Sequence, residues 1–216
     1  MNISVEKFVL GDLATNTYIV TDEEKGECAV VDPAVESDAL LSRLKEKNVK
    51  YILLTHGHFD HIGGAKAVKE LTNAKVVIHR EDEPMLSDCD YNLFQLQYPG
   101  KEMPQTSADI ITEDGTEIPF GDGTIKVMHT PGHTRGGVCY IFSDDRVIFS
   151  GDTLFHLSAG RTDFRGGNSR EELRSLMKIG SLEGDYTVYP GHEMSTTLAY
   201  ERKYNRYMKN LLRKKL

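Results

Sequence analysis

Cysteine is scarce in this chain, which has only three among 216 residues. Cys28, Cys89 and Cys139 lie far apart and form no C-x-x-C pair. Their number is odd and their spacing is wide, so the sequence indicates neither a disulfide framework nor a cysteine-ligated metal site. We therefore expect a reducing compartment, and the cytoplasm is the simplest one.

Long apolar runs are also missing. No segment reaches the length of a membrane span. Glu6 and Lys7 interrupt any apolar run near the N-terminus, so nothing there resembles a signal peptide. We therefore predict a cytoplasmic protein that has no membrane partner.

Concentrated positive charge is the third absence. The formal net charge is −7 and most basic residues are scattered, whereas binding of nucleic-acid phosphates needs a concentrated positive face. The locally basic stretch 202–215 has helical spacing and is typical of a solvated helix face. We therefore predict that the partner is a small molecule and not a nucleic acid. The sequence does not indicate an oligomeric state.

Short β-rich segments alternate with amphipathic helical segments, and approximately the same order occurs twice. The β-α-β passages imply parallel pairing, with helices that cover the sheets. No linker divides the chain, so we predict one domain, 1–216, with an α/β fold: a four-layer α/β/β/α sandwich of two mixed sheets flanked by helices. The expected strands are 3–10, 17–21, 28–32, 51–55, 75–79, 116–119, 124–129, 138–142, 146–150 and 186–189. The expected helices are 37–47 (capped by Ser37), 62–71, 169–179 and 195 onward.

Residues 81–113 have no sustained period. They contain three prolines and scattered aromatic residues, so we expect a short helix followed by a long surface loop. Long irregular loops in compact domains are often functional. This loop is therefore a candidate for one wall of the substrate site.

Histidine is concentrated in one short stretch, which takes three of the eight histidines in the chain. His56, His58, Asp60 and His61 fall within six positions, directly after the apolar run 51–55. Neutral imidazole nitrogens and carboxylate oxygens are ligands for zinc, iron or manganese. A strand that ends at Thr55 would place His56 and His58 on one side, and a tight turn would bring the other two back. The stretch predicts ligands for one metal ion, and more readily for two.

Three further ligand-type residues follow apolar strands in the second half of the chain. His133, Asp152 and His192 each come directly after a glycine. Glycine there lets the backbone turn sharply and approach a metal closely. Ligands collected from several strand ends would make a rigid site. A fourth place, 160–164, carries an arginine and an aspartate instead.

These motifs resemble those of the metallo-β-lactamase-fold hydrolases, and specifically the glyoxalase II-like branch. The resemblance is carried by T-H-G-H-F-D-H-I-G-G (55–64), T-P-G-H-T (130–134), S-G-D-T-L-F (150–155), G-R-T-D-F (160–164) and Y-P-G-H-E (189–193). The motifs run in the family's order and span nearly the whole catalytic domain. The resemblance implies the metallo-β-lactamase sandwich fold and a centre of two divalent ions. Zinc is the first expectation, with iron or manganese as alternatives.

The resemblance also implies a role for each position. The first ion would be held by His56, His58 and His133. The second would be held by Asp60, His61 and His192. Asp152 would bridge both ions together with a water or hydroxide, and Asp32 would orient a ligand histidine from behind.

The implied reaction is hydrolysis by a metal-bridging hydroxide. Asp60 and Asp152 would be the catalytic residues, with Asp60 as a candidate proton carrier. No separate general acid stands out, and a thiolate leaves without protonation whereas an amide nitrogen does not. A thioester or activated ester is therefore favoured as the substrate, as in a hydroxyacylglutathione hydrolase.

Departures from the family pattern weaken a strict glutathione specificity. The chain ends soon after the His192 motif, so we expect no C-terminal glutathione-binding helical domain, as in the compact bacterial forms. Arg161 meets a basic position of the glutathione-contact pattern, but Asp163 and Met194 stand where tyrosines are usual. Arg161 and Asp163 are candidate substrate contacts, with a surface ion pair as the alternative.

Other functions stay open at this point. A persulfide dioxygenase shares the fold and the 160–164 motif but uses a single iron held by two histidines and an aspartate. A β-lactamase is disfavoured because Asp152 stands where such enzymes usually have cysteine or serine. A ribonuclease of this fold would need a large inserted domain, and there is no room for one between Asp152 and His192. A non-catalytic metal-binding protein is the remaining class. We expect His79 and His129 to be structural and His156 to line the cleft.

Overall fold

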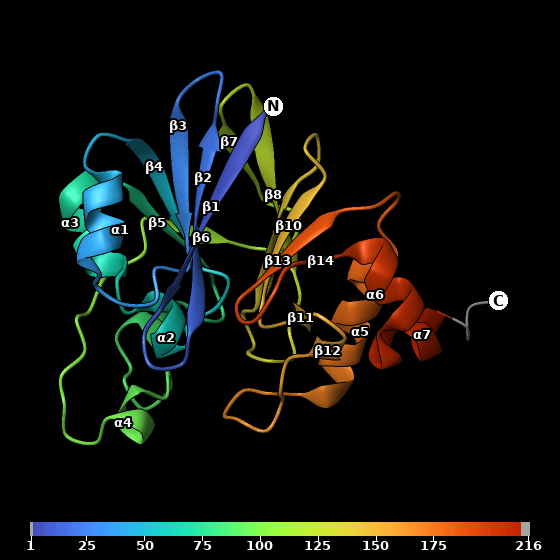
Figure 1. Cartoon of the computed structure of the whole chain (residues 1–216). Coiled ribbons are helices and arrows are strands. Elements are labelled where there is room, and N and C mark those ends of the chain that lie inside the picture. The colour runs from blue at the N-terminus through green and yellow to red at the C-terminus, as the bar shows by residue number, and fades with distance from the viewer. Residues whose placement is uncertain (1, 213–216) are drawn as a thin grey trace.

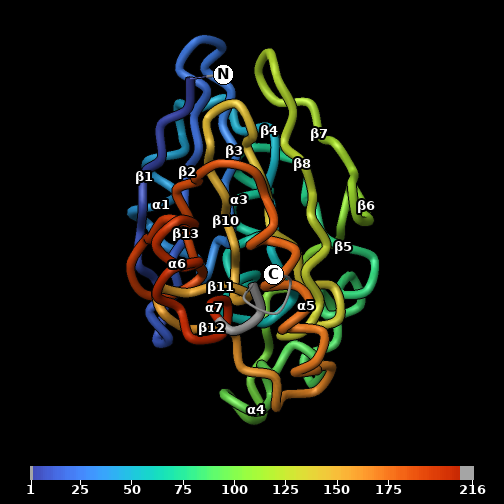
Figure 2. The backbone as a smooth tube through the Cα atoms, turned by 90° about the vertical axis from the view of Figure 1, so that its right-hand side faces the viewer, coloured from blue at the N-terminus to red at the C-terminus, as the bar shows by residue number. Residues whose placement is uncertain are grey.

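The computed structural model describes residues 2–212, and the side chains as far as Lys209. Two six-stranded sheets pack face to face, and helices cover the outer face of each (Figure 1). The predicted α/β/β/α sandwich is therefore confirmed. Seen from the side in Figure 2, the last three helices lie in front of the second sheet.

The first sheet is built from the N-terminal half of the chain and has the order β1-β2-β3-β4-β5-β6. Its first three strands pair antiparallel, whereas β3 to β6 pair parallel. The strands are β1 Ile3–Leu10, β2 Thr15–Asp22, β3 Glu27–Val31, β4 Asn48–Leu53, β5 Lys75–His79 and β6 Ile110–Thr112.

The second sheet has the order β14-β13-β10-β9-β8-β7. Only β10 and β13 pair parallel, and the other neighbours are antiparallel. The strands are β7 Glu117–Phe120, β8 Gly123–His129, β9 Val138–Phe142, β10 Val147–Gly151, β13 Thr187–Pro190 and β14 Thr196–Thr197, and a separate small hairpin is formed by β11 Leu154–Phe155 and β12 Ser158–Ala159.

Helices α1 and α3 cover the first sheet, and α5, α6 and α7 cover the second (Figure 1). The helical elements are α1 Asp38–Leu44, α2 Phe59–Ile62, α3 Ala65–Thr72, η1 Glu83–Leu86, α4 Phe94–Gln97, α5 Ser169–Gly180, α6 Leu198–Tyr204 and α7 Arg206–Leu212. Among residues 2–212, none of these helices is long and apolar enough to span a membrane.

Three layers of buried apolar side chains hold the sandwich together. The middle layer lies between the sheets and includes Tyr18, Phe120, Phe142 and Phe149. The outer two layers lie between each sheet and its helices. Because Tyr18 comes from the first sheet and the three phenylalanines from the second, burial of these rings fixes the position of one sheet on the other.

The predicted helix 62–71 is wrong at its start. The structure has two helices there, α2 and α3, separated by Gly63 and Gly64. A Cβ atom on either glycine would clash with the carbonyl of Ala34 or Val35. The helix is interrupted where the backbone at Gly63 and Gly64 packs directly against the backbone of residues 34–35. The apolar pattern of residues 62–71 contains no sign of this distant contact.

Other predicted boundaries also shift. The helix 37–47 is shorter, although Ser37 caps it as predicted by accepting from the Leu40 amide. Strand 51–55 begins earlier and ends at Leu53. The irregular stretch 81–113 contains η1, α4 and the unpredicted edge strand β6.

The predicted C-terminal helix from residue 195 is two helices, which are separated at Asn205. The Asn205 backbone is extended, and its side-chain amide donates to the Ser158 carbonyl and to Glu201. The predicted solvated basic face is wrong at Arg202. Its guanidinium donates to the carbonyl of Gly180, the last residue of α5, and to those of Leu182 and Gly184 just after the helix. Residues 213–215 of the basic stretch lie outside the described residues.

Candidate metal centre

The predicted ligands lie in the segments that follow the carboxyl ends of strands. The loop after β4 carries His56 and His58 and leads into α2, which carries Asp60 and His61. The second sheet contributes its three ligands from the loops after β8, β10 and β13. The loops from the two sheets meet at one end of the sandwich, the lower end in Figure 1.

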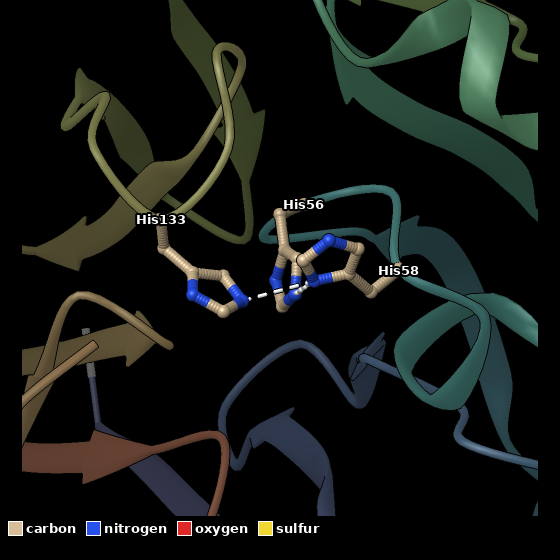
Figure 3. Close-up of side chains that lie close together, drawn as sticks. All are labelled: His56, His58 and His133. Carbon is tan, nitrogen blue, oxygen red and sulfur yellow. Dashed lines mark hydrogen bonds between the residues drawn. The ribbon is translucent and has the colours of Figure 1, made fainter. Parts of the chain in front are cut away.

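Three imidazoles converge in the first group. Nδ1 of His58 lies 3.1 Å from Nε2 of His56 and 2.9 Å from Nε2 of His133. Figure 3 shows His56 and His58 on one loop with His133 reaching them from the other half of the molecule. All three are buried. Nitrogen atoms from these three residues could hold one metal ion.

Hydrogen bonds on the far side orient two of these rings. Nδ1 of His133 donates to the Arg161 carbonyl at 2.7 Å. The Thr55 hydroxyl donates to Asp32 Oδ2 at 2.6 Å and can therefore accept from His56 Nδ1, 3.2 Å away. Each contact turns the Nε2 lone pair of the ring toward the cluster, which is how proteins prepare histidine ligands.

Asp60, His61 and His192 form the second group. Nε2 of His61 lies 3.5 Å from Asp60 Oδ2, and Nε2 of His192 lies 3.4 Å from the same oxygen. Asp32 accepts from His61 Nδ1 at 2.9 Å. Asp32 therefore lies behind a predicted ligand histidine, where the family resemblance placed it.

Asp152 lies between the two groups. Its carboxylate oxygens are 3.4 Å from Nε2 of His61 and 3.5 Å from Nε2 of both His133 and His192. A single carboxylate thus faces histidines of both groups. This is the placement expected of a ligand that bridges two ions.

The ionisation states differ between the groups. Burial lowers the pKa of His58 to about 3, so this imidazole is neutral. Burial also lowers the pKa of His61, but Asp60, Asp152 and Asp32 outweigh it and raise the value to about 9. The histidines of the second group therefore lie in a field of negative charge that favours a cation.

The donor set fits divalent ions. Five imidazoles and two carboxylates lie close together, and these are the ligand types that zinc, iron and manganese accept. His58 Nε2, His61 Nε2 and Asp152 Oδ1 are buried and have no hydrogen-bond partner among the described residues. Gly191 packs so closely that a Cβ atom would clash with Asp152 and His61. A glycine is therefore required before His192.

Three polar residues of β2 escaped the sequence analysis. The Thr15 hydroxyl donates to Asp60 Oδ2 at 2.9 Å. The Asn16 amide donates to the carbonyls of Pro190 and Glu193, and the Tyr18 hydroxyl also donates to Pro190. The bonds from Asn16 and Tyr18 hold the loop of His192. The available signal was the run of polar residues in a strand, because buried polar groups need specific partners.

Asp82 also escaped the sequence analysis. Its buried carboxylate accepts from the Gly57 amide at 3.0 Å, the Thr134 hydroxyl at 2.6 Å and the Gly136 amide at 2.6 Å. It therefore ties the His56–His58 loop to the His133 loop. No sequence signal separated it from the acidic residues on either side.

A cavity of about 530 Å³ opens beside the centre. Leu93, Leu96 and Gln97 from the 81–113 stretch line it, where the loop was expected to form a wall. Arg161 also lines it, but its guanidinium makes two 2.7 Å hydrogen bonds to Asp163. Both side chains are more than half exposed.

The remaining histidines lie apart from the cluster. The rings of His79 and His129 stack with their centroids 4.0 Å apart. His156 stacks on Tyr200 and does not line the cavity beside the centre, so the expectation that it lines the cleft is wrong.

Comparison with known families extends these observations. The sequence model of the metallo-beta-lactamase superfamily matches residues 10–192, which include every predicted ligand. The chain belongs to this superfamily. Its members are mostly metal-dependent hydrolases, and the superfamily binds dinuclear metal.

Several individual proteins are similar over nearly the whole chain. The hydroxyacylglutathione hydrolase GloC of Haemophilus influenzae is 30% identical and covers 89% of this chain and 92% of its own. The crystal structure of the BLEG-1 B3 metallo-beta-lactamase has a TM-score of 0.88 and 34% identity, covering 95% of this chain and 99% of its own. TTHA1623 in a di-iron-bound form has a TM-score of 0.78 and 32% identity, covering 94% and 99%.

Proposed function

We propose that this protein is a dinuclear metal-dependent hydrolase that cleaves a thioester or activated ester, as a hydroxyacylglutathione hydrolase does. The observation that carries the proposal is the position of Asp152, which faces histidines of both groups at 3.4–3.5 Å. Similarity to GloC supports the reaction class. Zinc is the ion we propose first, and similarity to a di-iron-bound structure keeps iron as the alternative.

Two bound divalent ions would supply a water of lowered pKa and a Lewis acid for the carbonyl oxygen. The protein residues would provide the positioning. Asp32 and Thr55 orient His61 and His56, the Arg161 carbonyl orients His133, and the loop of His192 is held by β2.

Asp60 is suited to hold a metal ion rather than to donate a proton. Burial opposes ionisation of its carboxyl group, but His61 and His192 outweigh burial and lower its pKa to about 2. The ionised carboxylate is fixed by the Thr15 hydroxyl and lies close to His61 and His192, as a ligand of the second ion would. A thiolate leaving group needs no proton, which agrees with the absence of a separate acid.

The Asp152→Ala variant tests this proposal. We expect it to lose bound metal and hydrolytic activity together, because one carboxylate serves both groups. Metal content is measured by elemental analysis, and hydrolysis is measured with S-lactoylglutathione. The control is Asp122→Ala, which removes an exposed carboxylate that pairs with Lys25. Two bound ions and full turnover in Asp152→Ala would show that the bridging role is wrong.

Hydrolysis of a β-lactam is the second candidate, because the BLEG-1 B3 metallo-beta-lactamase is similar over nearly the whole chain. A chromogenic cephalosporin therefore belongs in the same assay. Oxygen uptake with glutathione persulfide separates both hydrolases from a mononuclear-iron dioxygenase. If the metal-loaded protein hydrolyses neither S-lactoylglutathione nor acyl thioesters of N-acetylcysteamine, the thioesterase proposal fails.

A further inference from the structure

The cavity beside the candidate metal centre has an apolar wall to which the proposed reaction gives no role. Residues of both ligand groups, including His58, Asp152 and His192, line the same cavity. A substrate whose reacting bond lies at the centre therefore places another of its groups against this wall. The wall is formed by six apolar side chains, Leu13, Phe59, Leu93, Leu96, Phe155 and Phe164.

Two of these leucines are open to solvent. Leu96 is 70% exposed and Leu13 is 44% exposed. Single exposed leucines are ordinary on a protein surface, but here they come from separate segments and gather around one cavity with further apolar side chains. Such a gathering is typical of a binding surface.

The wall is already formed and is tied to the metal motif. Leu93 has a φ of 70°, a left-handed conformation that disfavours bulky side chains. Asn92 holds the backbone on either side of this bend. Its side-chain oxygen accepts from the Phe94 amide at 2.9 Å, and its carbonyl accepts from the Phe59 amide at 3.0 Å. Unfavourable backbone kept in place by such contacts is common at ligand sites.

The charges around the cavity do not suit glutathione, which carries two carboxylates. Among the described residues that line it, only Arg161 has a permanent positive charge, and Asp163 already takes up two of its N–H donors. Glu193 adds a carboxylate to the same lining. A free cation would be needed to compensate the desolvation of a substrate carboxylate.

We propose that the wall binds an aliphatic chain carried by the substrate beside the bond that is hydrolysed, and that glutathione carboxylates are not recognised. The nature of that bond rests on the proposed function. Binding of the chain does not, so it can be measured without turnover.

Binding of stable thioethers provides the first test. Isothermal titration calorimetry compares N-acetylcysteamine carrying S-ethyl, S-butyl and S-hexyl groups, with the purified, zinc-loaded protein. Burying one methylene group strengthens binding by up to about fourfold, so we expect the Kd to fall about two- to fourfold with each methylene. S-hexylglutathione carries the same hexyl group and should bind no more tightly than the S-hexyl thioether.

Substitutions localise the effect. Leu96→Asp, and the milder Leu96→Ala, should flatten the dependence of Kd on chain length. Leu71→Asp is the matched control, since Leu71 is 41% exposed on α3 and does not line the cavity. The same chain-length dependence in Leu96→Asp as in the unmodified protein would place the chain elsewhere and contradict the proposal.

Hydrolysis then identifies which side of the thioester carries the chain. One series lengthens the acyl group on N-acetylcysteamine from acetyl to hexanoyl, and the other lengthens the thiol of an acetyl thioester. We expect kcat/KM to rise at least about tenfold along one series. Chain-length-dependent binding without turnover would refute the thioesterase proposal and leave this inference standing. The inference is wrong if binding does not depend on chain length. It is also wrong if S-hexylglutathione binds more than about tenfold tighter and Arg161→Ala abolishes the gain.

Discussion

The histidines of this protein show how the surroundings of an imidazole determine its protonation state. His58 is neutral because it is buried among other histidines. The pKa of His192 is instead raised to about 10, because its hydrogen bonds to Asp152 and Asp60 outweigh its burial. His79 lies outside the candidate centre, packs on the ring of His129 and has Glu113 and Asp114 nearby. It offers a test of electrostatics outside the candidate centre.

We predict that His79→Phe makes folding stability less dependent on pH. Burial, and then the nearby His129, lower the pKa of His79 to about 4 from 6.5. The unfolded chain therefore binds more protons between these values, and stability is lost as the pH falls from 6.5 toward 4. Between about pH 7.5 and about pH 5, the unmodified protein should lose about 1–2 kcal/mol more than the variant.

Urea unfolding at the two pH values measures this difference. The candidate centre is the same in both proteins, so its contribution to the pH dependence cancels in the comparison. Phenylalanine keeps a ring for stacking on His129. Equal losses in the two proteins would mean that His79 is not the titrating group.

At the scale of elements, the centre depends on loops that are held by residues from other elements. Asn16 of β2 fixes the loop of His192, and Asp82, just after β5, joins the loop of His58 to the loop of His133. These contacts hold the strand ends of the two sheets close together, so that the ligand residues that follow them reach the same centre.

Asp82→Asn should therefore weaken ion binding without touching a ligand. An amide cannot accept at both of its polar ends, so either Gly136 or the Gly57 and Thr134 pair loses an acceptor. Loss of a supporting contact behind metal ligands typically weakens affinity about 10–100-fold. Zinc titration against a competing chelator measures the change, which we expect at the ion held by His58 and His133.

The exposed Asp90 on the same segment gives the matched control, Asp90→Asn. That variant should bind zinc as the unmodified protein does. If Asp82→Asn also binds both ions with unchanged affinity, the two loops are held by other contacts and the positioning role is wrong.

On the scale of the whole molecule, the candidate centre joins the two sheets. His56 and His58 follow β4 of the first sheet, whereas His133, Asp152 and His192 follow strands of the second. Ion binding should therefore stabilise the packing of one sheet on the other, because ligands that bind only the folded state raise its stability.

Removal of the ions by a chelator should accordingly lower the Tm. An ion present at 100 times its Kd contributes about 2.7 kcal/mol at each site. Differential scanning calorimetry with and without chelator measures the shift, and added zinc should reverse it. The Asp152→Ala variant should show a much smaller shift. A chelator effect of equal size in that variant would mean that the stabilising ion binds elsewhere.

The sequence by itself determined the layers and the ligand types. Alternating apolar segments predict the strands, and glycine beside histidine at strand exits marks His133 and His192, because both signals depend on neighbours along the chain. Tertiary structure alone decided the features that depend on distant contacts. The break at Gly63 and Gly64 reflects backbone from 34–35, and Asp82 acts on loops far away in sequence. The apolar wall forms only when α4 and the hairpin β11–β12 reach the same cavity. The hydrophobic periodicity within each segment does not predict contacts between segments that are distant in sequence.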